Sequence, residues 1–416
     1  MCATQITQKE RQRIRELAKL YMEYAHLPVM REREKLWRAH NALAGERPLI
    51  VMESGPFIKE MLPPPECESL AAREIESALL RWIVNHELID DDKAIPPYFS
   101  VNWDIQNCEF GLEDVKVARA KTGGLAFQHE HPMPDIKNGL SKLKPSSFSV
   151  DRRKTLEAKT LAEDLLGDII PVAIRNGSLT WSMVPSSKIN MLMGMEAMLF
   201  AFVENPDEMH ALYRFITDDV LAFVRWQERE GLLCPNNGFD YIGGGSYGFS
   251  DELPGAGGFV TANDLWGHLN SQETLNISPK MFSEFVYPYY AEIADAFGLI
   301  YYGCCEPVHA IWKDCLSQLP NLRKISVSPW CDEEFMGSAL AGGGVIYSRK
   351  PSPNYIGADR LLDEEAFSRH IAKTLAASKG CRLEFIFRDI YTVFGDKGRA
   401  GRAVGIVRRL IDKHWR

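Results

Sequence analysis

The sequence lacks the features of several protein classes. It has no apolar run close to the ~20 residues that a membrane-spanning helix requires. The segment after Met1 leads into charged residues and lacks the apolar core of a secretion signal. Basic residues are not in excess, since 48 lysines and arginines stand against 56 acidic residues and the net charge is −8. We therefore expect a cytoplasmic protein that acts on neither membranes nor nucleic acid.

The number of cysteines argues against a further class, the small disulfide-rich proteins. The chain has 9 cysteines among 416 residues, an odd number in a long chain, which argues against a small disulfide-stapled scaffold. Hydrophobic residues make up 45% and charged residues 25%, enough for a large core and a polar surface. We expect free thiols in a reducing compartment.

Short apolar runs alternate with helical stretches along most of the chain. We predict eight buried strands: Leu49–Glu53, Tyr98–Trp103, Ile169–Arg175, Phe259–Asp264, Leu299–Cys304, Leu322–Val327, Gly344–Arg349 and Leu383–Arg388. Helical spacing follows many of them, at Pro279–Phe297, Val308–Gln318, Asp332–Leu340 and Glu364–Ala376. This alternation is typical of βα units around a parallel sheet.

The number of units favours an α/β fold in which the strands close into a (β/α)8 TIM barrel. An open doubly wound sheet is the alternative that the count alone allows. Two amphipathic stretches, residues 6–26 and 30–43, precede the first strand and predict an N-terminal helical extension within residues 1–45. We expect residues 1–416 to form a single domain.

Two segments interrupt the alternation. Residues 105–160 are of mixed polarity, and we interpret them as an insertion after the second strand. Residues 231–258 are rich in glycine, with a run at Gly243–Gly245 that does not follow a strand and open a helix as a phosphate loop does. We interpret this segment as a flexible lid before the fourth strand.

Chemistry in a barrel gathers at the carboxyl ends of the strands. The residues predicted there are Glu53, Asn102, Asp104, Arg175, Asn176, Asp264, Cys304, Cys305, Glu306, Ser328, Cys331, Arg349, Lys350, Arg388 and Asp389. A carboxylate directly after an apolar run, such as Glu53 or Asp264, is costly to bury unless it is paired or bound to metal. The arginines have a structural alternative, in which they form ion pairs at the top of the barrel.

The segment from Tyr301 to His309 is the densest cluster of candidate metal ligands. A thiolate and a carboxylate two residues apart, Cys304 and Glu306, lie on one side of an extended strand and are a plausible half of a zinc site, with Cys305 on the other side. The next ligand would be one of Cys331, Asp264, His268, Glu273 and His309. A β-bulge would exchange Cys304 and Cys305. The structural alternative is a pair of cysteines that pack as small apolar side chains.

Two segments resemble a known superfamily. Residues 276–290, Asn-Ile-Ser-Pro-Lys-Met-Phe-Ser-Glu-Phe-Val-Tyr-Pro-Tyr-Tyr, are similar to the stretch that precedes the fifth barrel strand in uroporphyrinogen-decarboxylase-like proteins. The last unit, from Leu383 through Asp389 to Arg408, resembles the final strand and helix of the same superfamily. The resemblance covers about residues 170–415. It implies a (β/α)8 barrel and one of two chemistries, cofactor-free decarboxylation or zinc-dependent methyl transfer.

The details of the resemblance favour methyl transfer. Decarboxylases of the superfamily carry an arginine-rich motif after the first strand, but here Glu53 is followed by Ser-Gly-Pro-Phe. Asp104 is similar to their aspartate after the second strand. Methyltransferases often carry His-x-Cys at the fifth strand, where this chain has Tyr302 and Cys304, and their late cysteine corresponds to Arg388 or Asp389. The implied ligand set is therefore rearranged.

We thus predict a corrinoid-protein-dependent, zinc-assisted methyltransferase that acts on a small methylated substrate. The cobalamin would come from a partner protein, because the corrinoid-binding pattern Asp-x-His-x-x-Gly is absent. The predicted residues are Asp104, Asp264 and Arg175 for catalysis, Glu53, Asn102, Arg349 and Arg388 for substrate, and Cys304, Cys305, Glu306 and Cys331 for zinc.

Two alternatives remain. One is a metal-free decarboxylase of the uroporphyrinogen decarboxylase type, in which Arg175, Arg349 or Arg388 binds carboxylates and Asp104 is the acid or base. The other is a catalytically silent barrel that binds a small molecule.

Overall fold

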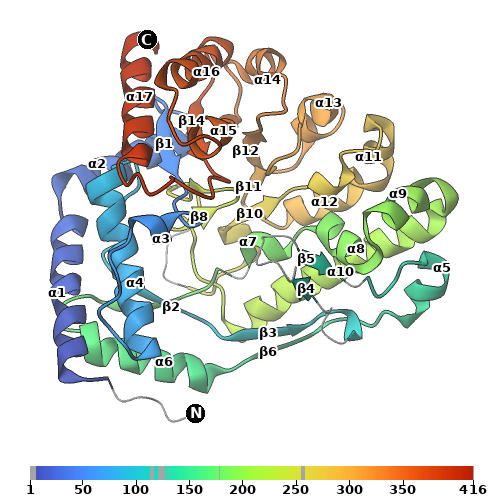
Figure 1. Ribbon diagram of the computed structural model, residues 1–416. Helices are drawn as coiled ribbons and strands as arrows, with labels where there is room; N and C mark the ends of the chain where they lie inside the picture. The colour runs from blue at the N-terminus through green and yellow to red at the C-terminus, as the bar shows by residue number, and fades with distance from the viewer. Residues whose placement is uncertain are drawn as a thin grey trace.

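A computed structural model describes residues 6–112, 117–119, 127–129, 131–177, 179–253 and 258–415, with the backbone alone for 117–119 and 127–129. Its centre is a six-stranded parallel sheet in the order β1-β14-β13-β12-β11-β10 (Figure 1). The strands are β1 Leu49–Met52, β10 Trp266–Leu269, β11 Leu299–Tyr302, β12 Leu322–Val327, β13 Ile346–Arg349 and β14 Leu383–Phe387. They are buried almost throughout, as expected of parallel strands that are covered on both faces.

A second parallel pair lies apart from this sheet. Strands β2 (Phe99–Asn102) and β7 (Val172–Arg175) pair with each other, from Phe99 opposite Val172 to Asn102 opposite Arg175. Within the described residues, neither β1 with β2 nor β7 with β10 forms a backbone ladder. The fold is therefore a mixed α/β fold with a parallel sheet, and hydrogen bonds do not close the sheet into a continuous barrel.

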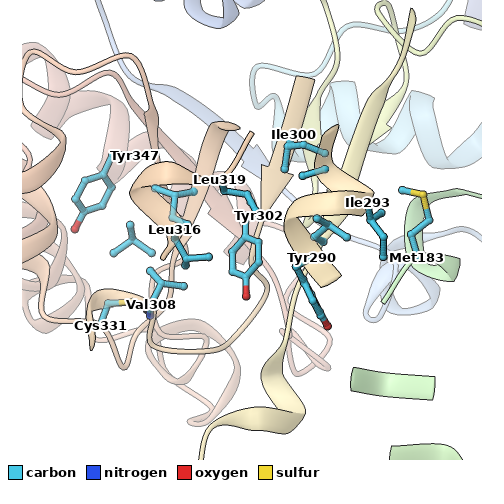
Figure 2. Packing of buried hydrophobic residues seen from close by; sticks show 14 of the residues in the cluster. Met183, Tyr290, Ile293, Ile300, Tyr302, Val308, Leu316, Leu319, Cys331 and Tyr347 are labelled. Carbon is cyan, nitrogen blue, oxygen red and sulfur yellow. Dashed lines mark hydrogen bonds between the residues drawn. The ribbon is translucent and has the colours of Figure 1, made fainter. Parts of the chain in front are cut away.

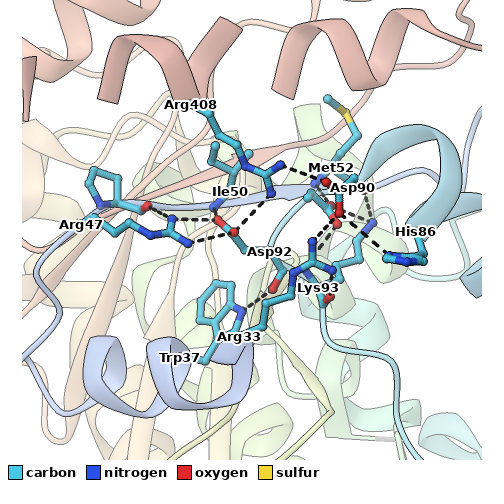
Figure 3. Close-up of polar contacts among 12 residues, drawn as sticks. Arg33, Trp37, Arg47, Ile50, Met52, His86, Asp90, Asp92, Lys93 and Arg408 are labelled. Carbon is cyan, nitrogen blue, oxygen red and sulfur yellow. Dashed lines mark hydrogen bonds and ion pairs between the residues drawn. The ribbon is translucent and has the colours of Figure 1, made fainter. Parts of the chain in front are cut away.

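Side chains occupy the positions where the neighbouring strands would pair. At β1, the Asp92 carboxylate accepts from the backbone N–H of Ile50 at 2.8 Å and the Asp91 carboxylate from that of Met52 at 2.7 Å (Figure 3). At β10, the Asn236 side chain accepts from the backbone N–H of Trp266 at 2.8 Å and donates to its carbonyl at 2.9 Å. Since buried backbone groups need partners, these side chains explain how both edges are stable without strand neighbours.

The helices surround the strands. They are α1 Gln8–Ala25, α2 Pro28–Asn41, α3 Ile58–Met61, α4 Leu70–Val84, α5 Ile136–Gly139, α6 Arg152–Leu166, α7 Leu179–Ser182, α8 Pro185–Met193, α9 Met195–Glu204, α10 Pro206–Glu230, α11 Pro279–Phe285, α12 Tyr287–Asp295, α13 His309–Trp312, α14 Glu333–Leu340, α15 Asn354–Gly357, α16 Glu364–Ala377 and α17 Arg399–His414. The N-terminal helix α1 packs on α4 and α6. No helix in the described part of the chain is long and apolar enough to cross a membrane.

The predicted insertion is present after β2. Strand β3 (Ile105–Cys108) pairs antiparallel with β6 (Ser147–Val150), and β4 (Val117–Arg119) with β5 (Phe127–His129). The final part of the segment predicted as insertion, from Arg152, belongs to α6, which packs against β7. The insertion is therefore shorter than the predicted range of 105–160.

One predicted strand is wrong. Residues 259–264 contain a 3-10 turn, Ala262–Asp264, and the strand follows at β10. The carboxylate of Asp264 accepts from the backbone N–H of Thr261 at 2.8 Å and from its hydroxyl at 2.9 Å, a capping arrangement that turns the chain. Asp264 thus precedes the strand and lies away from its carboxyl end. The other seven predicted strands overlap strands of the structure.

The interpretation of residues 231–258 as a lid is also wrong for the described part, which leaves out 254–257. Strands β8 (Tyr241–Ile242) and β9 (Ser246–Tyr247) form a hairpin, and residues 242–250 are buried. Asn41 donates to the carbonyls of Tyr247 at 3.0 Å and Phe249 at 2.7 Å. Because residues 242–250 are buried, the hairpin is part of the core.

Candidate active site at the carboxyl ends of the strands

The glycine tip of the β8–β9 hairpin lies against polar side chains that follow the strands. A methyl group placed on Gly243, which has φ +55°, would lie 2.3 Å from the Tyr301 ring. One placed on Gly244 would lie 2.7 Å from Arg388 Nη1 and 2.9 Å from Lys350 Nζ. Glycine is therefore needed for this close approach. We call the polar residues around the tip the rim cluster: Glu53, Tyr301, Cys304, Cys305, Lys350, Arg388 and Asp389.

Arg388 follows β14 and is the centre of the rim cluster. Its Nε lies 3.5 Å from the Glu53 carboxylate and 3.6 Å from the Asp389 carboxylate. Its Nε and Nη1 are buried and have no hydrogen-bond partner among the described residues. The Trp181 ring lies 5.7 Å from the guanidinium carbon. Arg388 Nε is thus flanked by two carboxylates, and its buried Nη1 forms no hydrogen bond within the described part of the chain.

Lys350 follows β13 and is 2% exposed. Its Nζ donates to the Tyr301 hydroxyl at 2.5 Å and lies 5.0 Å from the centre of the Tyr301 ring. That hydroxyl also shares a hydrogen bond of 2.8 Å with Ser348. Lys350 forms no ion pair with any carboxylate in the described part of the chain, which is unusual for a buried ammonium group.

Cys304 and Cys305 follow β11, and their sulfur atoms lie 3.5 Å apart. The Cys305 thiol also lies 3.5 Å from the Asp389 carboxylate. The hydrogen bond between the two thiols, with the positive charges of Arg388 and Lys350, lowers the pKa of Cys304. The same hydrogen bond raises the pKa of Cys305. Cys304 is therefore the more acidic thiol of the pair.

The four predicted zinc ligands do not meet. Both carboxylate oxygens of Glu306 accept backbone N–H groups, from Ser271 at 2.9 Å and from Cys304 at 2.8 Å. The Cys331 sulfur accepts from the backbone N–H of Val308 at 3.4 Å, within the packed core (Figure 2). Among the described residues, no group of three or more His, Cys, Asp or Glu side chains is arranged to hold a metal ion. These residues, as arranged, do not fit zinc.

His268, on β10, also lies near the rim cluster. Its Nδ1 donates to the carbonyl of Thr180 at 2.6 Å, and its Nε2 is buried without a hydrogen-bond partner among the described residues. Burial, together with the charges of Lys350 and Arg388, lowers the pKa of His268 to about 4. The imidazole is therefore neutral near pH 7, with an unused acceptor on Nε2.

Two cavities border the hairpin. One of about 510 Å³ is lined by Glu53, Arg81, Asn85 and Tyr241, and so reaches the rim cluster at Glu53. The other, of about 380 Å³, is lined by residues of the β2–β7 pair, the hairpin and β10, including Asn102, Arg175, Asp240 and His268. Both volumes are in the range of small-molecule sites.

Several predicted site residues lie outside the rim cluster. Arg349 is buried and fully engaged, with Glu333 at 2.7 Å and the Ser328 carbonyl at 2.6 Å. Arg175 pairs with Asp240 at 2.5 Å in the smaller cavity. Asp104 pairs with Lys154, on α6. The arginines at positions 349 and 175 therefore follow the structural alternative, in which they form ion pairs.

Sequence reasoning brought Glu53, Arg388, Cys304 and Cys305 to one place, and the structure joins them. It placed Lys350 beside Arg349 at the end of the same strand but chose Arg349 as the substrate-binding residue. Because successive residues of a strand point to opposite faces of the sheet, Arg349 and Lys350 cannot both face the rim cluster. Tyr301 and Ser348 were not predicted as site residues, because both lie within predicted strands. Their hydroxyl groups do not distinguish them from other buried strand residues.

Comparisons with known proteins give little further information. No protein-family model matches the chain, and no curated protein matches it. Among solved structures, the chain is similar to a methyltransferase from Methanosarcina mazei, with 12% identity over 92% of this chain and 98% of that chain and a TM-score of 0.49. A likeness this low assigns neither a family nor a reaction.

Proposed function

We propose that this chain is a methyltransferase with a (β/α)8-type barrel, and that it removes a methyl group from a small substrate held at the rim cluster. The observation that carries the proposal is the thiol pair of Cys304 and Cys305, 3.5 Å apart, beside the cations Arg388 and Lys350, which lower the pKa of Cys304, at the carboxyl ends of the strands. The resemblance of residues 276–290 to the methyltransferase-containing superfamily agrees with this proposal.

Methyl transfer is a displacement at carbon. The acceptor supplies the electron pair of the new bond to the methyl carbon, and the heteroatom of the substrate keeps the electron pair of the bond that breaks. The protein must therefore hold the substrate by its other end and present the methyl group to the acceptor. Arg388 and Lys350 are suited to hold the substrate, and the Cys304 thiol lies beside them.

The proposed acceptor is a corrinoid carried by a partner protein. This part of the proposal rests on the superfamily resemblance and on the missing Asp-x-His-x-x-Gly pattern. Zinc is a separate prediction from the sequence. Metal analysis of the purified protein tests it, because about one zinc per chain that is lost in Cys304→Ala would support it.

The test uses free cob(I)alamin as acceptor and a panel of N-, S- and O-methylated small carboxylic acids as donors. We expect methylcobalamin absorbance to appear with one class of donor, together with the demethylated acid by NMR. Cys304→Ala should lose most of this activity. Cys108→Ala, which removes an exposed thiol outside the site, should keep it.

A second candidate is metal-free decarboxylation of a small acid. The observation that favours it is the buried Lys350 without a carboxylate partner, since such a cation suits a substrate carboxylate. In this reaction the bond between the carboxylate carbon and its neighbour breaks, CO2 leaves, and the electron pair is protonated. Asp104, paired with Lys154, lies outside the cluster and is poorly placed as the acid. Release of CO2 from the same panel, without methyl transfer, would establish this candidate.

A further inference from the structure

We propose that Cys304 and Cys305 form a vicinal dithiol, which hydrogen peroxide oxidises reversibly to a disulfide between the two adjacent residues. This oxidation site goes beyond the proposed function, because the disulfide forms whether or not the chain transfers methyl groups. Under the proposed function the oxidation would remove the Cys304 thiol from the rim cluster. The test below measures oxidation alone, so the failure of one proposal leaves the other standing.

A bend after β11 brings the two thiols together. Side chains of successive residues in an extended strand point to opposite faces, which keeps adjacent sulfur atoms apart. Strand β11 ends at Tyr302, and Gly303 follows with φ +101°, a left-handed conformation that favours glycine. Beyond this turn the sulfur atoms of Cys304 and Cys305 lie 3.5 Å apart. They are in contact, and a shift of about 1.5 Å would bring them to the length of an S–S bond, about 2.0 Å.

Hydrogen bonds hold the backbone at Cys304. Its N–H donates to the Glu306 carboxylate at 2.8 Å, and its carbonyl accepts from the Ser326 hydroxyl at 2.7 Å. A side chain on Gly303 would begin 2.8 Å from Cβ of Ser326, so the turn lies directly against β12. Because the backbone is held on both sides, the folded chain already presents the two thiols to each other.

A small oxidant reaches the pair through Cys305, which is half-buried, whereas Cys304 is buried. One sulfur takes an oxygen atom from hydrogen peroxide and becomes a sulfenic acid, and water is released. The other sulfur then attacks the sulfenic acid, the S–S bond forms, and the oxygen leaves as a second water. The two thiols thus lose two electrons and two protons, and the peroxide gains them. The Asp389 carboxylate, 3.5 Å from the Cys305 sulfur, is placed to accept the proton of that thiol.

The disulfide is of the kind that is easily reduced again. Adjacent Cα atoms are about 3.8 Å apart, below the range of about 4.4–6.8 Å that is usual for disulfides. A disulfide held at this shorter spacing is strained, and strained disulfides are the labile ones. The pair is therefore suited to reversible oxidation and unsuited to a permanent cross-link.

The test treats the full chain with one equivalent of hydrogen peroxide, blocks the remaining thiols with N-ethylmaleimide and digests the protein with trypsin. The tryptic peptide of residues 281–313 contains Cys304, Cys305 and no other cysteine. We expect this peptide to carry no maleimide and to be lighter by two hydrogen atoms than the unmodified peptide. The protein should lose two of its 9 thiols, and dithiothreitol should restore both.

Matched serine variants separate the pair from the other thiols. In Cys304→Ser and Cys305→Ser the remaining thiol lacks its partner, so its oxidation should stop at a sulfenic acid, which dimedone traps. Cys108→Ser removes an exposed thiol elsewhere and should leave the disulfide unchanged. The proposal is overturned if both thiols of the wild-type peptide still react with maleimide, if a sulfenic acid persists there, or if the disulfide links this peptide to a different one.

Discussion

At the scale of single residues, Glu306 differs most from its sequence interpretation. A carboxylate two residues after a cysteine suggests a metal ligand, but its oxygens accept the backbone N–H groups of Ser271 and Cys304. Glu306 therefore holds the loop that carries the thiol pair. The sequence could not reveal this, because a ligand and a loop acceptor have the same side chain and the same spacing.

We predict that Glu306→Gln lowers the free energy of unfolding by about 1–3 kcal/mol, because an amide NH2 would meet a buried backbone N–H. Urea unfolding of both proteins, each measured with and without a zinc chelator, checks this. A stability loss that is the same under both conditions supports the structural role. A wild-type protein that the chelator destabilises to the level of the variant would instead make Glu306 a zinc ligand.

At the scale of elements, the β8–β9 hairpin is the part of the fold that sequence reasoning misjudged. Three consecutive glycines suggest flexibility, but Gly243 and Gly244 are required by close packing against Tyr301, Lys350 and Arg388. The same composition serves a mobile loop and a tightly packed tip. Only the tertiary contacts distinguish them.

We predict slow amide hydrogen exchange over residues 242–250, at rates comparable with those of the central strands. The exposed loop at residues 359–361 is the internal control and should exchange quickly. Asn41→Ala removes two hydrogen bonds to the hairpin, which should cost about 2 kcal/mol and raise exchange at 247–250. Exchange of 242–250 as fast as the control loop would restore the interpretation as a lid.

At the scale of the whole molecule, acid should destabilise the fold through its buried histidines. The folded pKa of His268 is lowered to about 4 by burial, below the ordinary value of 6.5. Between these values the unfolded chain binds more protons, so stability falls as pH falls. For this group alone the loss between about pH 7 and pH 5 is about 2 kcal/mol.

Urea unfolding as a function of pH measures this loss. His268→Asn, which keeps a donor for the Thr180 carbonyl, should show a smaller loss by about that amount. His26→Gln, at an exposed position, is the control and should follow the wild-type protein. Parallel curves for His268→Asn and the wild-type protein would contradict a neutral, buried His268.

The sequence predicted the α/β architecture well, because buried parallel strands are apolar runs that end in polar residues, as β1 does with Leu-Ile-Val-Met before Glu53. It failed at Phe259–Asp264, where an apolar start leads into a capped turn and the strand begins at Trp266. It also could not show that Asp91, Asp92 and Asn236 occupy the edges of the sheet, since a side chain that replaces a neighbouring strand leaves no periodic pattern.

The central claim is that the rim cluster removes a methyl group from a small substrate. It is tested most directly by one comparison, in which cob(I)alamin and a ¹³C-methyl-labelled acid of the donor panel receive the wild-type protein or Cys304→Ala. We predict that the label appears in methylcobalamin with the wild-type protein and that Cys304→Ala loses most of this transfer. Equal transfer by both proteins, or loss of the carboxylate as CO2 with the methyl group retained, would contradict the account.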